Sequence, residues 1–501
     1  MLFNSFHFLC FFPIVIAVYF MIPKKTRYIW LLAASYYFYM SWNPQYAILV
    51  GTSTFITWVS GIYIGKAEEI SDSVKAVKMK KLVVGVSFIT NLSILVFFKY
   101  FNFLLDNLNS VLAGAGIRVI EKPFDILLPV GISFYTFQAL SYTVDVYRGG
   151  VKPERNFFKY ALFVSFFPQL VAGPIERSGN LLEQVNKVHT FKLWNYERIS
   201  RGLTLMLWGF FQKMVIADRV ALIVDQVYDE YWLYGSTALI LATILFAIQI
   251  YCDFASYSNI AIGAAQVMGF SLMENFNTPY MSKSIKEFWS RWHISLSTWF
   301  RDYLYIPLGG SRKGTIRKYL NKIIVFLVSG LWHGANWTFV VWGGIHGLYQ
   351  VIGEATYELR QKMLTKFKVK ADSFSYGLGQ MIITFILTDF AWIFFRADSL
   401  KGAFEIIQRI FTRTDMWTLF DKSIYTCGLD EKEFKVMIFG LVILLLVDLV
   451  KKVGNRRIDD FLSEQCLWFR WGILLMLLFT CVVFGVYGVG YDASQFIYFQ
   501  F

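Results

Sequence analysis

The sequence predicts an all-α protein that crosses a membrane many times. Charged residues make up 17% of its 501 residues and hydrophobic residues 56%, whereas soluble chains carry about a quarter charged residues. Residues 323–353 contain no Asp, Glu, Lys or Arg, and residues 231–273 contain only Asp253. A helix that spans the hydrocarbon core needs about 20 such residues. This composition excludes a soluble enzyme, a disordered chain and a disulfide-stapled secreted module.

Apolar runs recur along the whole chain and predict about eleven to thirteen membrane-embedded helices. They lie near residues 6–22, 28–41, 45–65, 82–105, 125–147, 156–173, 201–222, 231–252, 254–273, 323–352, 374–395, 433–450 and 467–490. The polar stretches between them are at most a few dozen residues long, and the sequence shows no internal repeat. We therefore predict one integral-membrane domain over residues 1–501.

The positive charges lie mainly in short loops. The net charge is +13, which in a soluble chain could indicate nucleic-acid binding. Here Lys24, Lys25 and Arg27 follow the first apolar run, and five lysines lie in residues 66–81 after the third. Short loops rich in Lys and Arg stay cytoplasmic. We therefore expect contact with membrane lipid, no nucleic-acid partner and an N-terminus outside the cytoplasm.

Residues 283–302 predict an amphipathic helix that lies in the membrane interface or packs onto the helix bundle near it. At 100° per residue from Ile285, seven apolar side chains fall within 60° of one direction, and only Ile294 breaks the pattern. The seven are Ile285, Phe288, Trp289, Trp292, Leu296, Trp299 and Phe300. Three tryptophans on one narrow face are typical of an interfacial helix. His293 falls just off the apolar edge, where an imidazole could face a water-filled entrance or simply anchor the helix.

The uncharged run 323–353 is too long for one straight helix. Its 31 residues would span about 46 Å, against a hydrocarbon core of about 30 Å. Several glycines offer places to break it, namely Gly330, Gly334, Gly343, Gly344 and Gly347. His333 lies ten residues from the start of the run, about 15 Å along a helix and near mid-membrane. Irregular backbone at that depth is tolerated where it lines a cavity, so we expect a cavity beside His333.

Among the five histidines, His333 is the strongest functional candidate because ionisable residues inside a membrane are costly and usually functional. The alternative is a neutral imidazole that holds two helices together. If the helix is continuous, His346 lies about 20 Å along its axis and 220° around it from His333. The two histidines could therefore share a metal ion only if the helix breaks. His7 and His189 are expected to be structural. The sequence has no HExxH motif, and we predict no metal site.

The buried charges leave two classes of protein open. Asp253 and Asp389 could belong to a proton path, or could be buried carboxylates satisfied by a neighbouring Tyr, Ser or Arg. Arg291 and Arg301 could pair with a phosphate-bearing donor, or could simply belong to the polar face of an interfacial helix. A transporter would need paired repeats and polar residues along a path, whereas an intramembrane transferase needs one deep histidine with access from both sides. The missing repeat and the sparse charge favour the transferase.

The chain resembles the membrane-bound O-acyltransferases, in the branch that contains the bacterial alginate O-acetylation proteins. The resemblance runs nearly end to end and rests on long, ordered motifs. They are LPVGISFYTFQALSYTVDVYRG (128–149), SFFPQLVAGPIER (165–177), GFFQKMVIADRVA (209–221), YCDFASYSNIAIG (251–263), NFNTPYMSKSIKEFWSRWHISLSTWFRDYLYIPLGGSRKG (275–314), LVSGLWHGANWTFVVWGGIHG (327–347), AWIFFRA (391–397) and FIYFQF (496–501).

The resemblance implies that His333, in LWHGA, is the catalytic histidine and that His293, in RWHISLSTWFRDY, is the second conserved histidine of the family. It implies a ring of helices around a central tunnel, with interfacial helices, in the bacterial cell membrane. Trp332, Asn336 and Trp337 could shape the pocket or be ordinary helix packing.

The same resemblance implies the substrates and partners. A cytoplasmic acyl thioester, with acetyl-CoA as the expected co-substrate and no bound cofactor, would meet a hydroxyl acceptor from the other side. The expected partners are an extracytoplasmic esterase-like acetyltransferase and a polysaccharide acceptor. The alternative within the family is the D-alanyl transfer protein of teichoic acid modification, which shares the RWH and WHG motifs. A lipid or polysaccharide transporter is the alternative from a different class.

Overall fold

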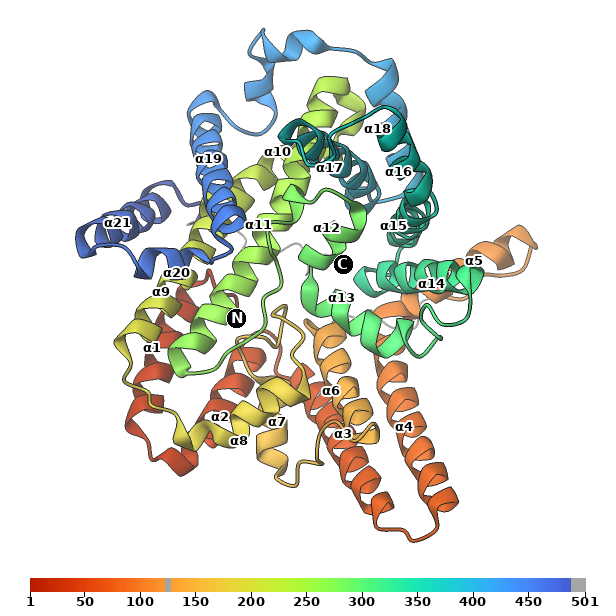
Figure 1. The fold of residues 1–501 in the computed structure, drawn as a ribbon, viewed down its shortest axis with the longest axis vertical. Coiled ribbons are helices and arrows are strands. Elements are labelled where there is room, and N and C mark those ends of the chain that lie inside the picture. Colours follow the sequence, from red (N-terminus) through yellow and green to blue (C-terminus); the bar gives the residue numbers. More distant parts are fainter. Residues whose placement is uncertain (122–127, 488–501) are drawn as a thin grey trace. The chain divides into compact units, whose positions relative to one another are not determined.

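The computed structural model describes residues 1–121 and 128–487. The described residues form helices joined by loops, with no strand among them (Figure 1), which confirms the all-α prediction. The predicted runs 125–147 and 467–490 reach beyond the described residues at 125–127 and 488–490, and the motif at 496–501 lies wholly outside them.

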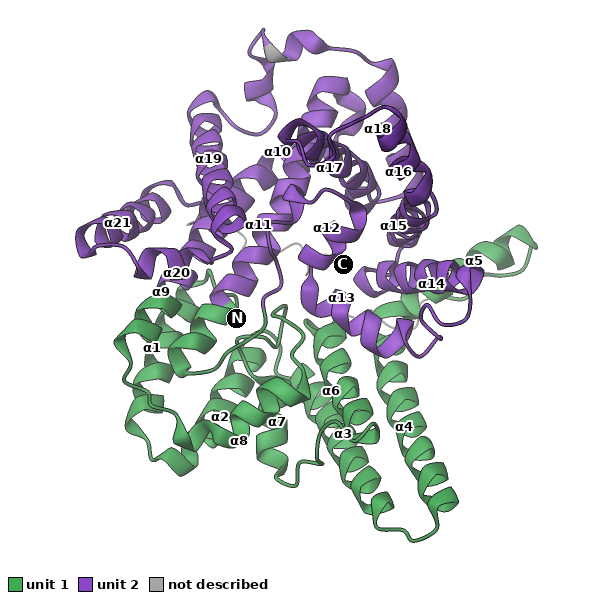
Figure 2. Ribbon diagram, viewed as in Figure 1, with its two compact units in different colours: residues 1–203, 261–273 green, residues 204–260, 274–501 purple. Residues whose placement is uncertain are grey.

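The chain divides into two compact units (Figure 2), residues 1–203 with 261–273 and residues 204–260 with 274–501. The helices of unit 1 are α1 (Phe6–Met21), α2 (Arg27–Met40), α3 (Tyr46–Glu68), α4 (Ser73–Leu95), α5 (Phe101–Gly114), α6 (Ile132–Tyr147), α7 (Phe157–Ser165) and α8 (Glu183–Lys187). Helices α9 (Tyr196–Phe211) and α11 (Ser236–Met268) contribute residues to both units. The single domain predicted over residues 1–501 stays a prediction.

Unit 2 holds both histidines of the predicted site. Its helices are α10 (Asp218–Asp229), α12 (Ile285–Arg291), α13 (Ile294–Phe300), α14 (Thr315–His333), α15 (Trp337–Ala355), α16 (Tyr357–Lys366), α17 (Phe374–Arg396), α18 (Leu400–Thr412), α19 (Glu431–Gly454), α20 (Ile458–Ser463) and α21 (Leu467–Phe484).

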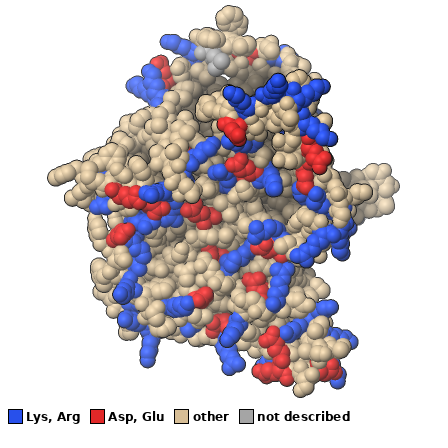
Figure 3. Space-filling view, viewed as in Figure 1, with Lys and Arg blue, Asp and Glu red and all other residues tan. Residues whose placement is uncertain are grey.

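Five of the described helical segments are long and apolar enough to cross a membrane. They are Tyr46–Glu68, Ser73–Gly114, Ser236–Met268, Phe374–Arg396 and Leu467–Phe484. Large apolar side chains stand exposed on all five, as with Ile48 on α3, Leu82 on α4 and Phe479 on α21, and such side chains are stable against lipid tails. Figure 3 shows Lys and Arg intermixed with Asp and Glu on the face in view, whereas the segment that holds α21 is tan. The count of eleven to thirteen embedded helices stays a prediction.

Unit 1 is held together by polar contacts between helices as well as by apolar packing. The Ser53 hydroxyl on α3 donates to Asn91 Oδ1 on α4 at 2.6 Å. The Tyr160 hydroxyl on α7 donates to Thr57 Oγ1 on α3 at 2.8 Å. All four side chains are buried. Hydrogen bonds of this kind join helices in a membrane, where hydrophobic burial drives association little.

The run 323–353 breaks as predicted, at Gly334. Helix α14 ends at His333, Gly334 is extended, and Asn336 begins α15 by accepting a hydrogen bond from the Thr338 amide at 3.1 Å. The two helices then pack backbone to backbone through glycines. A Cβ on Gly330 would lie 2.2 Å from the Phe339 carbonyl oxygen. This close hairpin places His333 at its bend, against side chains of α15.

The predicted continuous helix over 283–302 is wrong, although its predicted apolar face is right. Helix α12 ends at Arg291, Trp292 is extended, and His293 has φ 42° and ψ 55° before α13 starts. All seven predicted apolar side chains are nevertheless buried. A non-glycine residue in the left-handed region is uncommon, and here the backbone is held by a hydrogen bond from the Ile294 amide to the Asn275 carbonyl oxygen at 2.9 Å.

Candidate active site

The structure brings the two predicted site histidines together. The ring centroids of His293 and His333 lie 6.4 Å apart, although the residues are 40 positions apart in the sequence, His293 just before α13 and His333 at the end of α14. His293 is fully buried and His333 is 4% exposed. The His333 ring contacts the rings of Trp332, Trp342 and Phe395 at centroid distances of 5.1, 5.1 and 5.4 Å. Both imidazoles therefore lie in an aromatic environment from which bulk water is excluded.

Of the two places considered for His293, a water-filled entrance does not fit, because the ring is fully buried at the break between α12 and α13. Its Nδ1 lies 3.3 Å from Asn275 Oδ1. The same oxygen accepts from the Ser295 amide at 3.2 Å and from the Ser295 hydroxyl at 2.7 Å. An amide oxygen can only accept, so Nδ1 carries the proton of the neutral ring and Nε2 keeps the lone pair.

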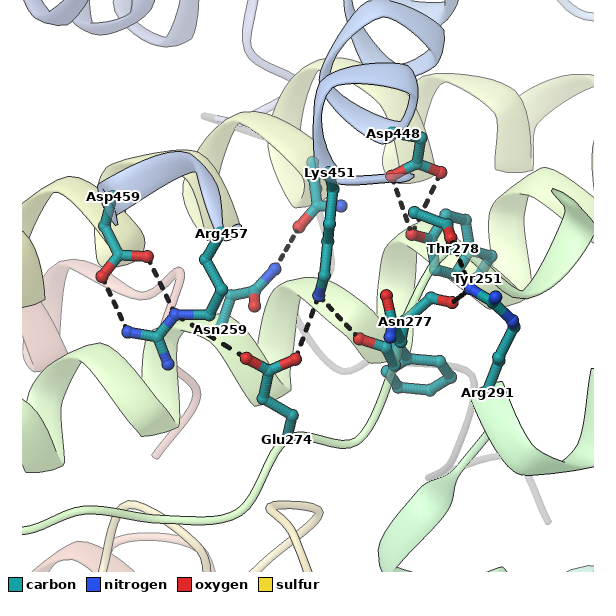
Figure 4. Close-up of polar contacts among 12 residues, drawn as sticks. Tyr251, Asn259, Glu274, Asn277, Thr278, Arg291, Asp448, Lys451, Arg457 and Asp459 are labelled. Atoms are coloured by element: carbon teal, nitrogen blue, oxygen red, sulfur yellow. Dashed lines mark hydrogen bonds and ion pairs between the residues drawn. The ribbon is translucent and has the colours of Figure 1, made fainter. Parts of the chain in front are cut away.

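The loop that carries Asn275 is fixed by charged side chains (Figure 4). Lys451 on α19 donates to the Glu274 carboxylate at 3.1 Å and to the Phe276 carbonyl oxygen at 3.0 Å. Arg291, at the end of α12, donates to the Asn277 carbonyl oxygen at 3.2 Å. The chain is thus held on both sides of Asn275, and this fixes the acceptor that orients His293.

Lowering the pH is expected to destabilise the fold through His293. Burial lowers the pKa of His293 from 6.5 to about 3. Below pH 6.5 the unfolded imidazole takes up a proton that the folded one does not, so the stability present above pH 6.5 falls as the pH drops toward 3, by about 1.4 kcal/mol per pH unit. We expect a loss of about 2 kcal/mol between pH 7 and pH 5, measured as a lower melting temperature of the detergent-solubilised protein.

The matched control for this effect is His293→Gln, because glutamine can still hydrogen-bond Asn275 but does not titrate. Its melting temperature should fall less between pH 7 and pH 5 than that of the wild type. An equal fall in both proteins would contradict the assignment of this acid sensitivity to His293.

The three residues near His333 in the sequence that could shape the pocket differ in their surroundings. Trp332 is buried, and its ring lies 5.9 Å from the ring of His293 and 5.1 Å from that of His333. Asn336 caps α15 through its side chain. Trp337 is 51% exposed and so cannot line an enclosed pocket. Of the three, only Trp332 lies at the site.

Of the other singled-out charges, Asp253 and Arg301 form ion pairs within the chain, whereas one carboxylate oxygen of Asp389 has no partner among the described residues. Asp253 accepts from Lys213 Nζ at 2.6 Å, and Lys213 also pairs with Asp218 at 2.8 Å. Asp253 is thus a satisfied buried carboxylate, as interpreted, although its ion-pair partner is a lysine rather than an arginine. Oδ1 of Asp389 is buried with no hydrogen-bond partner among the described residues, so the predicted partner is not found for that oxygen. Arg301 pairs with the neighbouring Asp302.

Three side chains at the site received no role from the sequence: Asn275, Trp342 and Phe395. Asn275 orients His293, while Trp342 and Phe395 contact the His333 ring. Each lies inside a motif already noted, at the start of NFNTPYM, within GANWTFVVWGG and within AWIFFRA. Membership of a motif was the available signal, but it does not say which side chains face the histidines.

The geometry suits proton transfer in a place without bulk water. A neutral imidazole can accept a proton from a reacting hydroxyl and return it to a leaving group. Enclosure by aromatic rings limits competing hydrolysis of a reactive substrate. The described part of the chain holds no group of three His, Cys, Asp or Glu side chains that could bind a metal ion.

Comparisons with known proteins agree with this chemistry. A sequence model of the membrane-bound O-acyltransferase family matches residues 153–395. The chain is 39% identical over 429 residues to the probable alginate O-acetylase of Azotobacter vinelandii, covering 83% of this chain and 79% of the relative. It is 35% identical over 406 residues to the peptidoglycan O-acetyltransferase of Helicobacter pylori, covering 76% and 73%. It is 27% identical over 290 residues to the teichoic acid D-alanyltransferase of Bacillus subtilis, covering 55% and 70%.

Proposed function

The chain belongs to the membrane-bound O-acyltransferase family, and we propose that it transfers acetyl groups for the O-acetylation of an extracytoplasmic polysaccharide. It is an O-acyltransferase of a membrane-bound family. The observation that carries the proposal is the approach of His293 and His333 within 6.4 Å, in a chain similar to an alginate O-acetylase and a peptidoglycan O-acetyltransferase.

In the proposed reaction His333 acts as the general base. It takes the proton of the acceptor hydroxyl as the hydroxyl oxygen bonds to the carbonyl carbon of an acyl thioester. The carbon–sulfur bond then breaks, and the leaving thiolate takes the proton from His333. The products are an oxygen ester and a free thiol, and the histidine returns to its neutral form. A positioned base of this kind contributes about 10²–10⁴ to the rate.

His293 supports this reaction as a second neutral imidazole. The hydrogen bond with Asn275 keeps the proton of His293 on Nδ1, and its lowered pKa keeps the ring uncharged at neutral pH. Its lone pair on Nε2 can accept a hydrogen bond from a second hydroxyl of the acceptor, and this contact aligns the attacking hydroxyl with His333. We assign His293 this orienting role and His333 the proton transfer.

The donor in this proposal is a cytoplasmic acyl thioester, acetyl-CoA, and no cofactor stays bound. The protein would lie in the bacterial cell membrane and take the acyl group on the cytoplasmic side of a tunnel that reaches His333. An extracytoplasmic esterase-like acetyltransferase would complete delivery to the polymer. The similarity to proteins that acetylate alginate and peptidoglycan supports a polysaccharide acceptor.

D-alanyl transfer is the second candidate function, favoured by the similarity to a teichoic acid D-alanyltransferase. The match covers 55% of this chain, whereas the match to the alginate O-acetylase covers 83% at higher identity. Acetyl transfer is therefore the better supported of the two.

The experiment that tests the function identifies the ester. Surface polymers from cells that express the chain, and from cells that lack it, are treated with mild base, and the released acids are identified by mass spectrometry. We expect acetate only from the expressing cells. Release of D-alanine instead would assign the chain to teichoic acid modification, and identical release from both strains would contradict acyl transfer.

Asn275→Ala is expected to lower ester formation by about 10- to 100-fold, the range known for partners that orient metal-binding histidines. The substitution removes the acceptor of His293 and of Ser295. Asn277→Ala is the matched control in the same loop, because the contact of Asn277 with Arg291 uses its backbone oxygen. Ester per folded protein should fall in the first variant only, and an equal fall in both would mean that the loop as a whole, rather than Asn275, matters.

A further inference from the structure

Next to the histidine pair, three side chains form a compact cluster that the proposed proton transfer does not use. The cluster consists of Trp342 and His346 on α15 and Trp392 on α17. The ring of Trp342 lies 5.0 Å from that of His346 and stacks on that of Trp392 at 5.7 Å, and the rings of His346 and Trp392 are 6.4 Å apart. Trp342 also contacts His333 at 5.1 Å. We call these three residues the donor cluster.

Each member of the donor cluster has a buried ring nitrogen without a hydrogen-bond partner among the described residues. In the two tryptophans this nitrogen is Nε1, which always carries a hydrogen and can only donate. In His346 it is Nε2. All three side chains are at most 1% exposed, so bulk water does not satisfy them.

The protonation of His346 follows from Trp289 on α12. Trp289 Nε1 donates to His346 Nδ1 at 3.2 Å, so Nδ1 must keep its lone pair. The neutral ring then carries its hydrogen on Nε2. The cluster therefore offers three N–H donors, and Trp289 acts as a positioning residue that sets the donor state of His346.

Three buried donors without acceptors in one place are unusual, because buried polar groups are nearly always paired and an unmade buried hydrogen bond is costly. Such donors fit a ligand that brings an acceptor oxygen into an apolar setting. The ring of Trp342, a member of this cluster, contacts the histidine assigned as the base. Two substrate oxygens come near that histidine in the proposed reaction. The hydroxyl oxygen gives up its proton to His333, and the carbonyl oxygen of the acyl group gains negative charge.

We propose that Trp342, His346 and Trp392 form the subsite that binds the carbonyl oxygen of the transferred acyl group. This inference rests on the proposed function. When the oxygen of the attacking hydroxyl bonds to the carbonyl carbon, an electron pair of the C=O bond moves onto the carbonyl oxygen. The N–H groups of the cluster then stabilise the negative charge on that oxygen. When that pair returns to re-form C=O, the carbon–sulfur bond breaks and the thiolate leaves. Donors fixed before the reaction stabilise such an oxyanion more than they stabilise the neutral carbonyl.

The test removes single N–H groups and leaves the aromatic rings in place. Trp342→Phe and Trp392→Phe are compared with Trp30→Phe, a control in unit 1 whose indole donates to the Val15 carbonyl oxygen at 3.0 Å. Membrane vesicles receive ¹⁴C-acetyl-CoA, and base-labile label is measured per folded protein. We expect kcat to fall about 10²-fold in the two cluster variants, with KM changed by less than about threefold and Trp30→Phe unaffected in rate.

A second pair of variants separates donation from packing. His346→Gln can accept from Trp289 and donate to the substrate, whereas His346→Leu can do neither. We expect His346→Gln to keep at least about a tenth of the rate and His346→Leu to lose about 10²-fold. Equal loss in both, or lower melting temperatures with unchanged kcat, would show that the cluster only packs. A raised KM at constant kcat would also overturn the inference. Absence of ester in the wild type would instead refute the proposed function.

Discussion

His333→Ala is expected to abolish ester formation while the protein still accumulates in the membrane. The variant lacks the base that takes the hydroxyl proton, so the rate should fall by at least about 10²-fold. His333 is the last residue of α14, and its ring contacts the rings of His293, Trp332, Trp342 and Phe395. Base-labile acetate on surface polymers, measured by mass spectrometry at matched membrane abundance, gives the readout.

His7→Ala is the control for this variant. His7 is exposed in unit 1 and bonds to the Tyr37 hydroxyl at 3.0 Å, so its loss should leave the ester unchanged. Unchanged ester in His333→Ala would exclude His333 as the base and would favour a transporter or scaffold. Loss of ester in both variants would point to a general requirement for intact protein rather than to the site.

Gly330→Ala is expected to disrupt the bend that carries His333. Its Cβ would lie 2.2 Å from the Phe339 carbonyl oxygen, a backbone atom that cannot rotate away, so α14 and α15 would have to separate. Overpacking of this kind costs typically 1–3 kcal/mol, and here we expect about 3 kcal/mol or more. The expected result is a large drop in membrane abundance and melting temperature, with ester formation falling alongside.

Gly344→Ala makes the same change on α15, beside Gly343, whose Cα would lie 3.4 Å from a Cβ on Gly330, and should be tolerated. A Cβ there would meet only Leu327 Cδ2, at 3.6 Å, which is an ordinary contact distance. A folded and active Gly330→Ala variant, or equal damage from both substitutions, would contradict the packing of α14 against α15.

Composition and hydropathy predicted the all-helical fold because a membrane forces apolar runs into helices. The break in the run 323–353 was also predictable, since its length exceeds the bilayer and its glycines are visible. The contact of Gly330 with Phe339 could not be predicted, because a single sequence does not give the register of two helices that fold back on each other. Trp342 reaches His333 only through that register.

The break at His293 was missed because the apolar pattern of residues 283–302 stays in phase across it. All seven residues of the predicted apolar face are buried although the helix breaks, so periodicity alone could not reveal two helices. The break is held by contacts between the Asn275 loop and residues 293–295, including the bond from the Ile294 amide to the Asn275 carbonyl oxygen. Non-local contacts of this kind decided the places of His293 and Asn275.

The most direct test of the central claim follows an acyl group from its donor to an ester through His333. Sealed inside-out vesicles that contain wild-type protein or His333→Ala at the same abundance receive ¹⁴C-acetyl-CoA on their outer, formerly cytoplasmic, face. The account predicts base-labile label with an equal amount of free thiol in the wild type, and background label in the variant. Equal labelling of both, or none in either, would contradict it.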